Sequence, residues 1–209
     1  MKHVYANRVL LCLLTLGALA GCSKTTTETT VPRTWKNASY QGPKFKNLLI
    51  MGVARFEERR RLFEDSLERA LGSEGVISEA SWKSLPAPEL LDAAEIRDVV
   101  EVGNFDGVII TRLVDAEVKV ESGVDPLAAA PMYTTYRESF DAVRDPNFFD
   151  PNADYRVQTA LYSAESEELV WLATSVTAKP PSLEEGIDSL TQTMARTLKE
   201  DGLVAPAAP

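Results

Sequence analysis

The sequence predicts an α/β fold, in which a single domain combines a mixed sheet of about five strands with about three helices. Two observations support this prediction. First, apolar runs of strand length recur along the chain. Second, segments with apolar residues spaced three and four positions apart, which is typical of helices, lie between the first few of these runs. The expected order is β-α-β-α-β-β-β-α over residues 45–203, which is enough chain for one hydrophobic core.

The first part of this domain has the pattern of a strand, a helix and a second strand. Residues 48–54 form a continuous apolar run, which is typical of a strand covered on both faces. Residues 57–71 then show helical spacing, and Gly72 follows as a terminator. A short strand is expected over residues 76–80. The side chains expected on the inner face of the helix are those of Leu62, Phe63, Ser66, Leu67, Ala70 and Leu71.

A second helix is expected over residues 89–102, closed by Gly103, and it leads into a buried strand at 108–110. Beyond Thr111 apolar and charged residues alternate as far as Val120, so the far half of this strand is expected to have one solvated face. Right-handed crossovers place the first and third strands together at the centre of the sheet.

The last third of the domain predicts a hairpin and a helix. Residues 155–162 and 169–177 are expected to pair as antiparallel strands, with Trp171 in the core. The last helix is expected to begin at Ser182, because Glu185 follows three residues later and completes a capping box.

The first 21 residues have the features of an export signal. A short basic start is followed by an apolar stretch at 9–20, which is too short to span a bilayer but has the length of a signal-peptide core. The run Leu19-Ala20-Gly21-Cys22 closely resembles the bacterial lipobox, where a peptidase cuts between Gly21 and Cys22. The alternative is an ordinary secretory signal with an incidental cysteine.

The lipobox resemblance implies that Cys22 carries a diacylglyceryl group and an N-acyl chain such as palmitate, so that the partner of the N-terminus is the lipid bilayer. Ser23 stands where an Asp would signal retention in the inner membrane, which favours the periplasmic side of the outer membrane in a Gram-negative host. Residues 22–44 are expected to be a flexible tether with a span of about 25 Å, and residues 204–209 a disordered tail.

Charge and composition exclude several classes of function. The net charge is −9, and residues 1–21 contain two of the 22 basic residues and none of the 31 acidic ones. Because nucleic-acid affinity rests on Lys and Arg, the mature chain is not expected to bind nucleic acid. The remaining charge favours solubility.

The mature chain also lacks the residues that carry common catalytic chemistry. The only histidine, His3, and one of the two cysteines, Cys12, lie in the export signal, and Cys22 carries the lipid. This excludes Cys/His zinc sites and Ser-His-Asp or Cys-His catalysis. The first strand is followed by Gly52-Val53-Ala54-Arg55, which lacks the glycine-rich motifs that bind the phosphates of nucleotides. We therefore expect no metal, no cofactor and no enzymatic activity.

A cluster of arginines opens the first helix. Arg55, Arg59 and Arg60 lie at the carboxyl edge of the first strand, where open α/β sheets bind ligands. The helix dipole disfavours cations in the first turns of a helix, so arginines at this position need an explanation. This placement predicts a patch for an anionic partner. The alternative is a solvated helix face with Glu57–Arg61 and Arg61–Asp65 pairs.

Residues 122–153 form a loop too long to be a simple connection. Aromatic residues anchor protein interfaces, so the loop is a candidate partner-binding site; its rings could equally fold the loop back over the sheet. The repeated Asp-Pro-Asn at 145–147 and 150–152 superficially suggests calcium, but this pattern is typical of type I turns. The candidate partner-binding residues are Tyr133, Tyr136, Phe140, Phe148 and Phe149.

The order of elements and the hairpin Leu161-Tyr162…Leu169-Val170-Trp171-Leu172-Ala173, followed by a capped helix, resemble a group of envelope lipoproteins. These are typified by the penicillin-binding-protein activators and by the N-terminal domain of TolB. The resemblance covers roughly residues 45–200 and rests on pattern alone. In the turn of the hairpin this chain has Glu165-Ser166-Glu167-Glu168 where those relatives usually have a glycine.

Together these features predict a non-catalytic envelope lipoprotein that binds another envelope protein. Two alternatives remain open: a carboxylate-based glycan hydrolase, and a small-ligand carrier with a pocket near Arg55 and Arg112. Two buried carboxyls about 5–10 Å apart in a cleft would favour the hydrolase. A flat aromatic patch would favour partner binding, and a closed apolar cavity the carrier.

Overall fold

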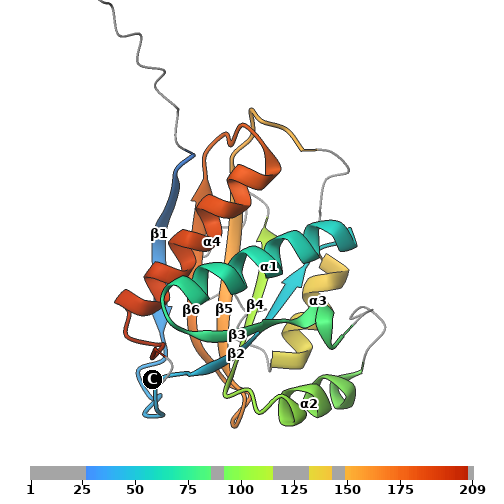
Figure 1. Cartoon of the computed structure of the whole chain (residues 1–209), viewed down its shortest axis with the longest axis vertical. Coiled ribbons are helices and arrows are strands. Elements are labelled where there is room, and N and C mark those ends of the chain that lie inside the picture. The colour runs from blue at the N-terminus through green and yellow to red at the C-terminus, as the bar shows by residue number, and fades with distance from the viewer. Residues whose placement is uncertain (1–26, 86–91, 115–131, 143–148, 207–209) are drawn as a thin grey trace, which may run out of the picture.

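The computed structural model describes residues 27–85, 92–114, 132–142 and 149–206, in which one six-stranded mixed sheet packs against four α-helices (Figure 1). The predicted α/β class is confirmed. The strands are β1 Thr29–Lys36, β2 Asn47–Val53, β3 Ile77–Ala80, β4 Gly107–Val114, β5 Tyr155–Ser163 and β6 Leu169–Thr177. The helices are α1 Glu57–Ser73, α2 Ala93–Val102, α3 Met132–Ala142 and α4 Leu183–Glu200, with a 3₁₀ turn η1 at Ser81–Lys83.

The strand order is β1-β6-β5-β4-β2-β3, so the two most apolar strands, β2 and β4, lie side by side and parallel. Every residue of β2 from Leu48 to Val53 is buried, as expected of a strand covered on both faces. The pairing of β5 with β6 confirms the predicted hairpin, and Trp171 is fully buried in the core.

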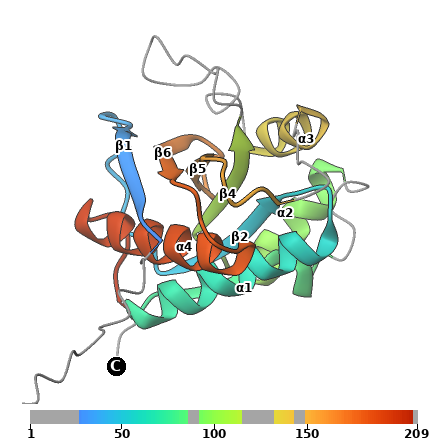
Figure 2. The same ribbon diagram turned by 90° about the horizontal axis from the view of Figure 1, so that it is seen from above.

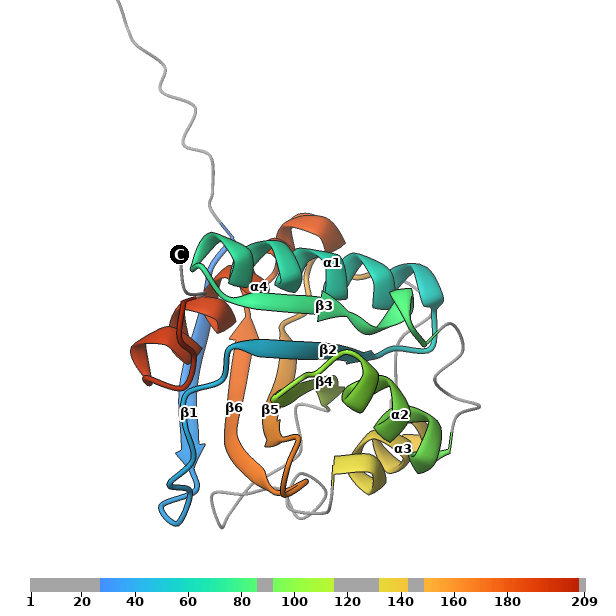
Figure 3. The same cartoon turned by 60° about the horizontal axis from the view of Figure 1, so that its bottom comes forward.

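Helices cover both faces of the sheet, as Figures 2 and 3 show. On one face α1 and α4 lie side by side. Leu67 of α1 and Met194 of α4 are buried in the hydrophobic cluster on this face. On the other face α2 and α3 contribute Ile96, Tyr136 and their neighbours to a second cluster. The single domain is therefore a three-layer sandwich, with the sheet as its middle layer.

The prediction of a flexible tether through residue 44 is wrong for residues 29–36. These residues form β1, which pairs antiparallel with β6 from Thr29 opposite Thr177 to Lys36 opposite Trp171. The segment has no apolar run, but β6 offers its backbone groups, and Thr and Val favour extended backbone. Cys22 and Ser23 lie outside the described residues.

The predicted C-terminal tail also begins too early. Val204 is buried in the first core cluster and forms a parallel bridge with Phe45. The amide of Ala205 donates a hydrogen bond to the Phe45 carbonyl at 2.9 Å. The ordered domain therefore extends past residue 203, and residues 207–209 lie outside its described part.

The long loop predicted over 122–153 contains helix α3. Tyr133 and Tyr136 are both buried in the second core cluster, so the alternative that these rings fold back over the sheet is confirmed for the two tyrosines. They are not surface anchors for a partner. The alternating segment 115–120 and residues 143–148 lie outside the described part of the chain.

Local capping follows the sequence closely. The Ser182 side chain accepts a hydrogen bond from the amide of Glu185 at 3.1 Å and opens α4, as predicted. Asp92 and Glu95 form a capping box that opens α2, so this helix begins later than the expected residue 89. In the β5–β6 turn, Glu167 adopts a positive φ of 59° in place of a glycine.

Two truncations test the reassignment of β1. Removing residues 1–26 should leave the thermal midpoint unchanged, because this truncation retains every residue of β1 and its pairing with β6. Removing residues 1–36 should lower the free energy of unfolding by roughly 2–4 kcal/mol, through loss of the β1–β6 hydrogen bonds and the burial of Val31 and Trp35. Equal midpoints for the two truncated chains in a circular-dichroism melt would show that residues 29–36 behave as a tether.

Candidate binding site

Arg60 does not belong to a surface patch. Its side chain is 1% exposed, and its guanidinium donates to the Glu57 carboxylate at 2.7 and 3.0 Å, to Ser81 Oγ at 3.2 Å and to the Leu85 carbonyl at 3.2 Å. Both the predicted anion-binding role and the alternative of a solvated helix face are therefore wrong for this residue. Arg60 joins α1 to the η1 turn.

Glu64, one helical turn further along α1, is fully buried beside Arg60. Its carboxylate accepts hydrogen bonds from the amide of Gly52 at 2.8 Å, from Ser81 Oγ at 2.8 Å and from the amide of Trp82 at 2.9 Å. Burial raises the pKa of Glu64 from 4.5 to about 7, against the opposing effect of these donors and of Arg60. The carboxylate thus fixes α1 to the end of β2.

The other arginines of the cluster have separate surroundings. Arg61 is the exposed partner of Glu57, at 2.7 Å, which confirms one of the two predicted helix pairs. The carboxylate of Asp65, the other expected partner, accepts instead from the indole of Trp82 at 2.8 Å. Arg55 is exposed, while Arg59 is partly buried and lies over the Phe56 ring at 4.7 Å. The predicted patch is therefore not a single site.

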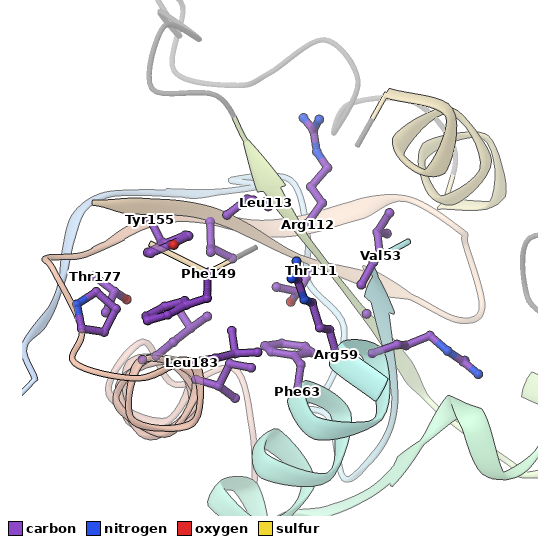
Figure 4. Close-up of a pocket in the computed structure, with 18 residues that line it drawn as sticks. Val53, Arg59, Phe63, Thr111, Arg112, Leu113, Phe149, Tyr155, Thr177 and Leu183 are labelled. Carbon is purple, nitrogen blue, oxygen red and sulfur yellow. The ribbon is translucent and has the colours of Figure 1, made fainter. Parts of the chain in front are cut away.

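A partly open cavity of about 130 Å³ lies at the carboxyl ends of β2 and β4, between α1 and α4 (Figure 4). This is the sheet edge at which the sequence predicts ligand binding. Figure 4 shows Arg59 extending toward Thr111, while Arg112 points away from the cavity. The apolar side chains that line the cavity include those of Val53, Phe63, Leu113, Phe149, Tyr155, Val157, Leu183, Ile187 and Leu190.

One of the predicted partner-binding aromatic residues lines this cavity. Phe149 stacks on Tyr155, with ring centroids 5.4 Å apart and an angle of 7° between the planes. Phe148 and the side chain of Phe140 lie outside the described part of the chain. Of the two arginines named for a carrier pocket, Arg112 lines the cavity, and its guanidinium donates to Gln158 at 2.7 Å. Arg55 is not among the lining residues.

A second, more polar cavity of about 410 Å³ lies near the opposite end of the sheet. At its wall Arg97 pairs with the Glu167 carboxylate at 2.8 Å and lies over the Tyr133 ring at 4.3 Å. Burial, with Glu167 nearby, raises the pKa of Tyr133 to about 12. Because these groups satisfy one another and hold the β5–β6 turn, we assign this cavity a structural role.

Within the described ranges, no three His, Cys, Asp or Glu side chains are grouped so that they could hold a metal ion. The amides of Asn152 and Ala153 donate to Asp150, at 2.9 and 3.2 Å, which confirms the turn interpretation for residues 150–152; residues 145–147 lie outside the described part. Glu64 is the one buried carboxylate among the described residues, so these residues lack the buried pair expected of the hydrolase.

Among the described residues, none of the helices combines the length and the apolar composition that spanning a membrane requires. The sequence matches no protein-family model and no curated protein. Among solved structures, the chain is similar to the PelC dodecamer from Paraburkholderia phytofirmans, with 13% identity, a TM-score of 0.42, and coverage of 85% of this chain and 99% of that chain.

It is also similar to lipoprotein GNA1162 from Neisseria meningitidis, with 8% identity, a TM-score of 0.39, and coverage of 75% of this chain and 96% of that chain. A bacterial lipoprotein thus has a weakly similar fold. At TM-scores this low, the likenesses carry no functional argument.

The sequence did not single out the walls of the cavity. The dense arginines indicated the correct edge of the sheet, but Leu183, Ile187 and Leu190 come from the distant α4. Helical spacing can indicate that such side chains face inward, but not which strand ends they meet. The burial of Glu64 could not be predicted from the sequence either, because a glutamate in an amphipathic helix is ordinarily exposed to solvent.

The Glu64 carboxylate predicts an unusual pH dependence of stability. Because its pKa is raised in the folded state, the folded chain binds more protons than the unfolded chain between about pH 4.5 and 7. This contribution is complete below pH 4.5 and is lost as the pH rises through 7, a change of about 3 kcal/mol in the free energy of unfolding. Chemical denaturation at several pH values measures it.

Glu64→Gln should remove this slope and lower the stability at pH 5, because an amide cannot accept all three hydrogen bonds. The exposed Glu58 on the same helix is the matched control, and Glu58→Gln should retain the slope. If wild type and Glu64→Gln gave parallel curves from pH 5 to 7, the carboxylate would not titrate in this range.

Proposed function

We propose that the protein is an envelope lipoprotein, anchored through acylated Cys22, whose domain is a non-catalytic binding module with the apolar cavity as its binding site. One observation carries this proposal: Thr27 and Glu28, five and six positions after Cys22, are held by residues next to the cavity. An anchor at Cys22 would therefore hold the binding end of the domain at the membrane.

Contacts between the first described residues and α4 support this placement. Ser189 Oγ donates to the Thr27 carbonyl at 3.0 Å, and the Ala178 amide donates to the Glu28 carbonyl at 3.3 Å. Ala178 follows Thr177 and precedes Pro180, both of which line the cavity. In Figure 1, β1 and α4 both begin near the upper end of the molecule.

The distance to the anchor is short. Thr27 follows Cys22 by five positions, so the connecting segment extends at most about 17 Å. A tether of residues 22–44 would give the domain more freedom, but β1 incorporates residues 29–36 into the sheet. Acyl chains on Cys22 would therefore keep the cavity end close to the lipid headgroups. With Ser23 after the cysteine, we assign the anchor to the periplasmic leaflet of the outer membrane.

The form of the cavity favours binding over hydrolysis. Its walls are almost entirely apolar, and the buried carboxylate of the described residues, Glu64, is engaged by three donors. A concave apolar site with few polar groups at its wall is suited to holding a bulky apolar group. We propose that the occupant belongs to another component of the envelope.

Metabolic labelling with an alkyne analogue of palmitate tests the anchor. Wild-type protein should be labelled and should remain with membranes, whereas Cys22→Ala should lose the label. Cys12→Ala is the matched control, because Cys12 lies in the export signal, and it should be labelled like wild type. Undiminished labelling of Cys22→Ala would overturn the lipoprotein assignment.

The orientation has a separate test. The mature chain has no cysteine other than Cys22, so a dye can be placed at one introduced cysteine. In liposomes containing an acceptor lipid, the exposed cavity-end variant Ala178→Cys should transfer energy more efficiently than Val102→Cys, at the exposed end of α2. Equal transfer from the two positions would contradict a cavity that faces the membrane.

A further inference from the structure

We propose that the cavity binds an uncharged apolar group of about one aromatic ring or one branched alkyl chain, selected by its shape rather than by hydrogen bonds. The inference rests on the proposed function, since it names the class of ligand for the same binding site. It is supported by the polar groups in the wall of the cavity, by the rigidity of that wall and by the volume that it encloses.

The threonine hydroxyls in the wall are already bonded to other hydroxyls of the chain. Thr111 Oγ1 donates to Thr159 Oγ1 at 3.2 Å. The hydroxyls of Thr177 and Thr29 share a hydrogen bond of 2.8 Å, and Thr29 donates to Ser189 Oγ at 2.9 Å, so the hydroxyl hydrogen of Thr177 is directed at Thr29. Neither lining hydroxyl therefore offers its hydrogen to a ligand.

The three arginines that line the cavity also have partners within the chain. Arg60 is paired with the Glu57 carboxylate at 2.7 Å. Arg112, bonded to a side chain of β5, points away from the cavity. The guanidinium of Arg59 lies over the Phe56 ring at 4.7 Å and has interactions of its own. Because an unpaired charge in an apolar space is costly, the group that enters the cavity is expected to be uncharged.

Phe149 and Tyr155 form one fixed wall. Their rings are stacked with centroids 5.4 Å apart, and Figure 4 shows Phe149 between Tyr155 and Leu183. The Tyr155 hydroxyl accepts from the amide of Asp150 at 2.8 Å and donates to its carbonyl at 3.1 Å, which holds the backbone next to Phe149. The space for a ligand therefore lies beside the Phe149 ring, toward Phe63, and not between Tyr155 and Leu183.

Phe63 packs against the backbone of β2 on the opposite side. A Cβ atom at Gly52 would lie 3.1 Å from the Phe63 ring, so the ring and this strand end are already in close contact. The Glu64 carboxylate holds the same backbone through the Gly52 amide at 2.8 Å. Since both walls are fixed in this way, the cavity is formed before a ligand arrives and selects among ligands by their size.

The volume of the cavity sets that size. An engineered apolar cavity of about 150 Å³ holds one benzene molecule and stays free of water when empty. The cavity here, about 130 Å³, therefore suits one ring or a branched alkyl group. Because protein interiors are close-packed, an unfilled apolar space lowers stability, and a ligand that fills it restores the missing contacts.

This chemistry has two sources: a small free molecule, or an apolar side chain of another polypeptide. Ligand-detected NMR titrations with residues 23–209 distinguish them, since both core clusters lie between Val31 and Val204 and so within this chain. The probes are toluene, its charged analogues benzoate and benzylammonium, naphthalene, and a pentapeptide with one central phenylalanine among glycines, capped at both ends.

Toluene should bind about tenfold more tightly than either ion, because the ions lose their hydration without gaining an unengaged partner. Tighter binding of the peptide than of toluene would identify a polypeptide side chain as the source, and the reverse order a free molecule. Benzoate or benzylammonium binding as tightly as toluene would overturn the restriction to uncharged groups.

Ala54→Leu tests the place of binding, because Ala54 follows β2 and lines the cavity. The larger side chain should weaken toluene binding about tenfold. Ala178→Leu makes the same change at an exposed position that does not line the cavity, and this matched control should bind like wild type. Undiminished binding of toluene to Ala54→Leu, or no binding of toluene and peptide to wild type, would overturn the inference.

Ile187→Ala enlarges the cavity from α4, at a side chain that is only partly buried. The affinity for naphthalene relative to toluene should rise about tenfold in this variant, because the added volume receives the second ring. An unchanged ratio in a variant that retains a cooperative thermal melt would show that the volume does not select the ligand. None of these outcomes affects palmitate labelling, so failure here is distinguishable from failure of the lipoprotein assignment.

Discussion

The buried carboxylate of Glu64 is the contact on which the cavity end of the domain depends. It accepts from the end of β2 through Gly52 and from the η1 turn through Ser81 and Trp82. Arg60 adds a second connection between α1 and the same turn. A buried ion beside an apolar core is costly unless its lone pairs are satisfied, so these donors leave α1 little freedom to move. Phe63 and Arg59, on either side of this network, are thereby held at the cavity.

The sequence predicted the elements that carry a local signal, and it missed those whose stability depends on residues far away in the chain. The apolar run of β2 and the capping serine at Ser182 are local signals, and both were correct. β1 has no such signal, because most of its residues are polar, without regular alternation, and its stability comes from β6, more than 130 residues away in the chain. Helix α3 was missed because its buried tyrosines also suit an exposed recognition loop.

The candidate site was only partly predictable, for a related reason. The arginines marked the edge of the sheet, but the sequence could not separate Arg60, which is neutralised by Glu57 and supported by Ser81, from Arg59, which faces the cavity. That distinction depends on which side of α1 meets η1, and η1 becomes a neighbour only through the β2–β3 crossover. The apolar wall from α4 requires the complete fold.

The short connection to Cys22 and the small cavity have a joint consequence for partner choice. Under the proposed acylation of Cys22, a domain held within about 17 Å of its anchor would meet groups near the headgroups more often than groups far from the membrane. The chain as a whole is acidic, which disfavours adsorption of the domain to anionic lipid. A small apolar group can approach through water and still gain free energy from burial in the cavity. The proposed anchor and the small apolar cavity would together favour a compact apolar group over an extended lipid tail.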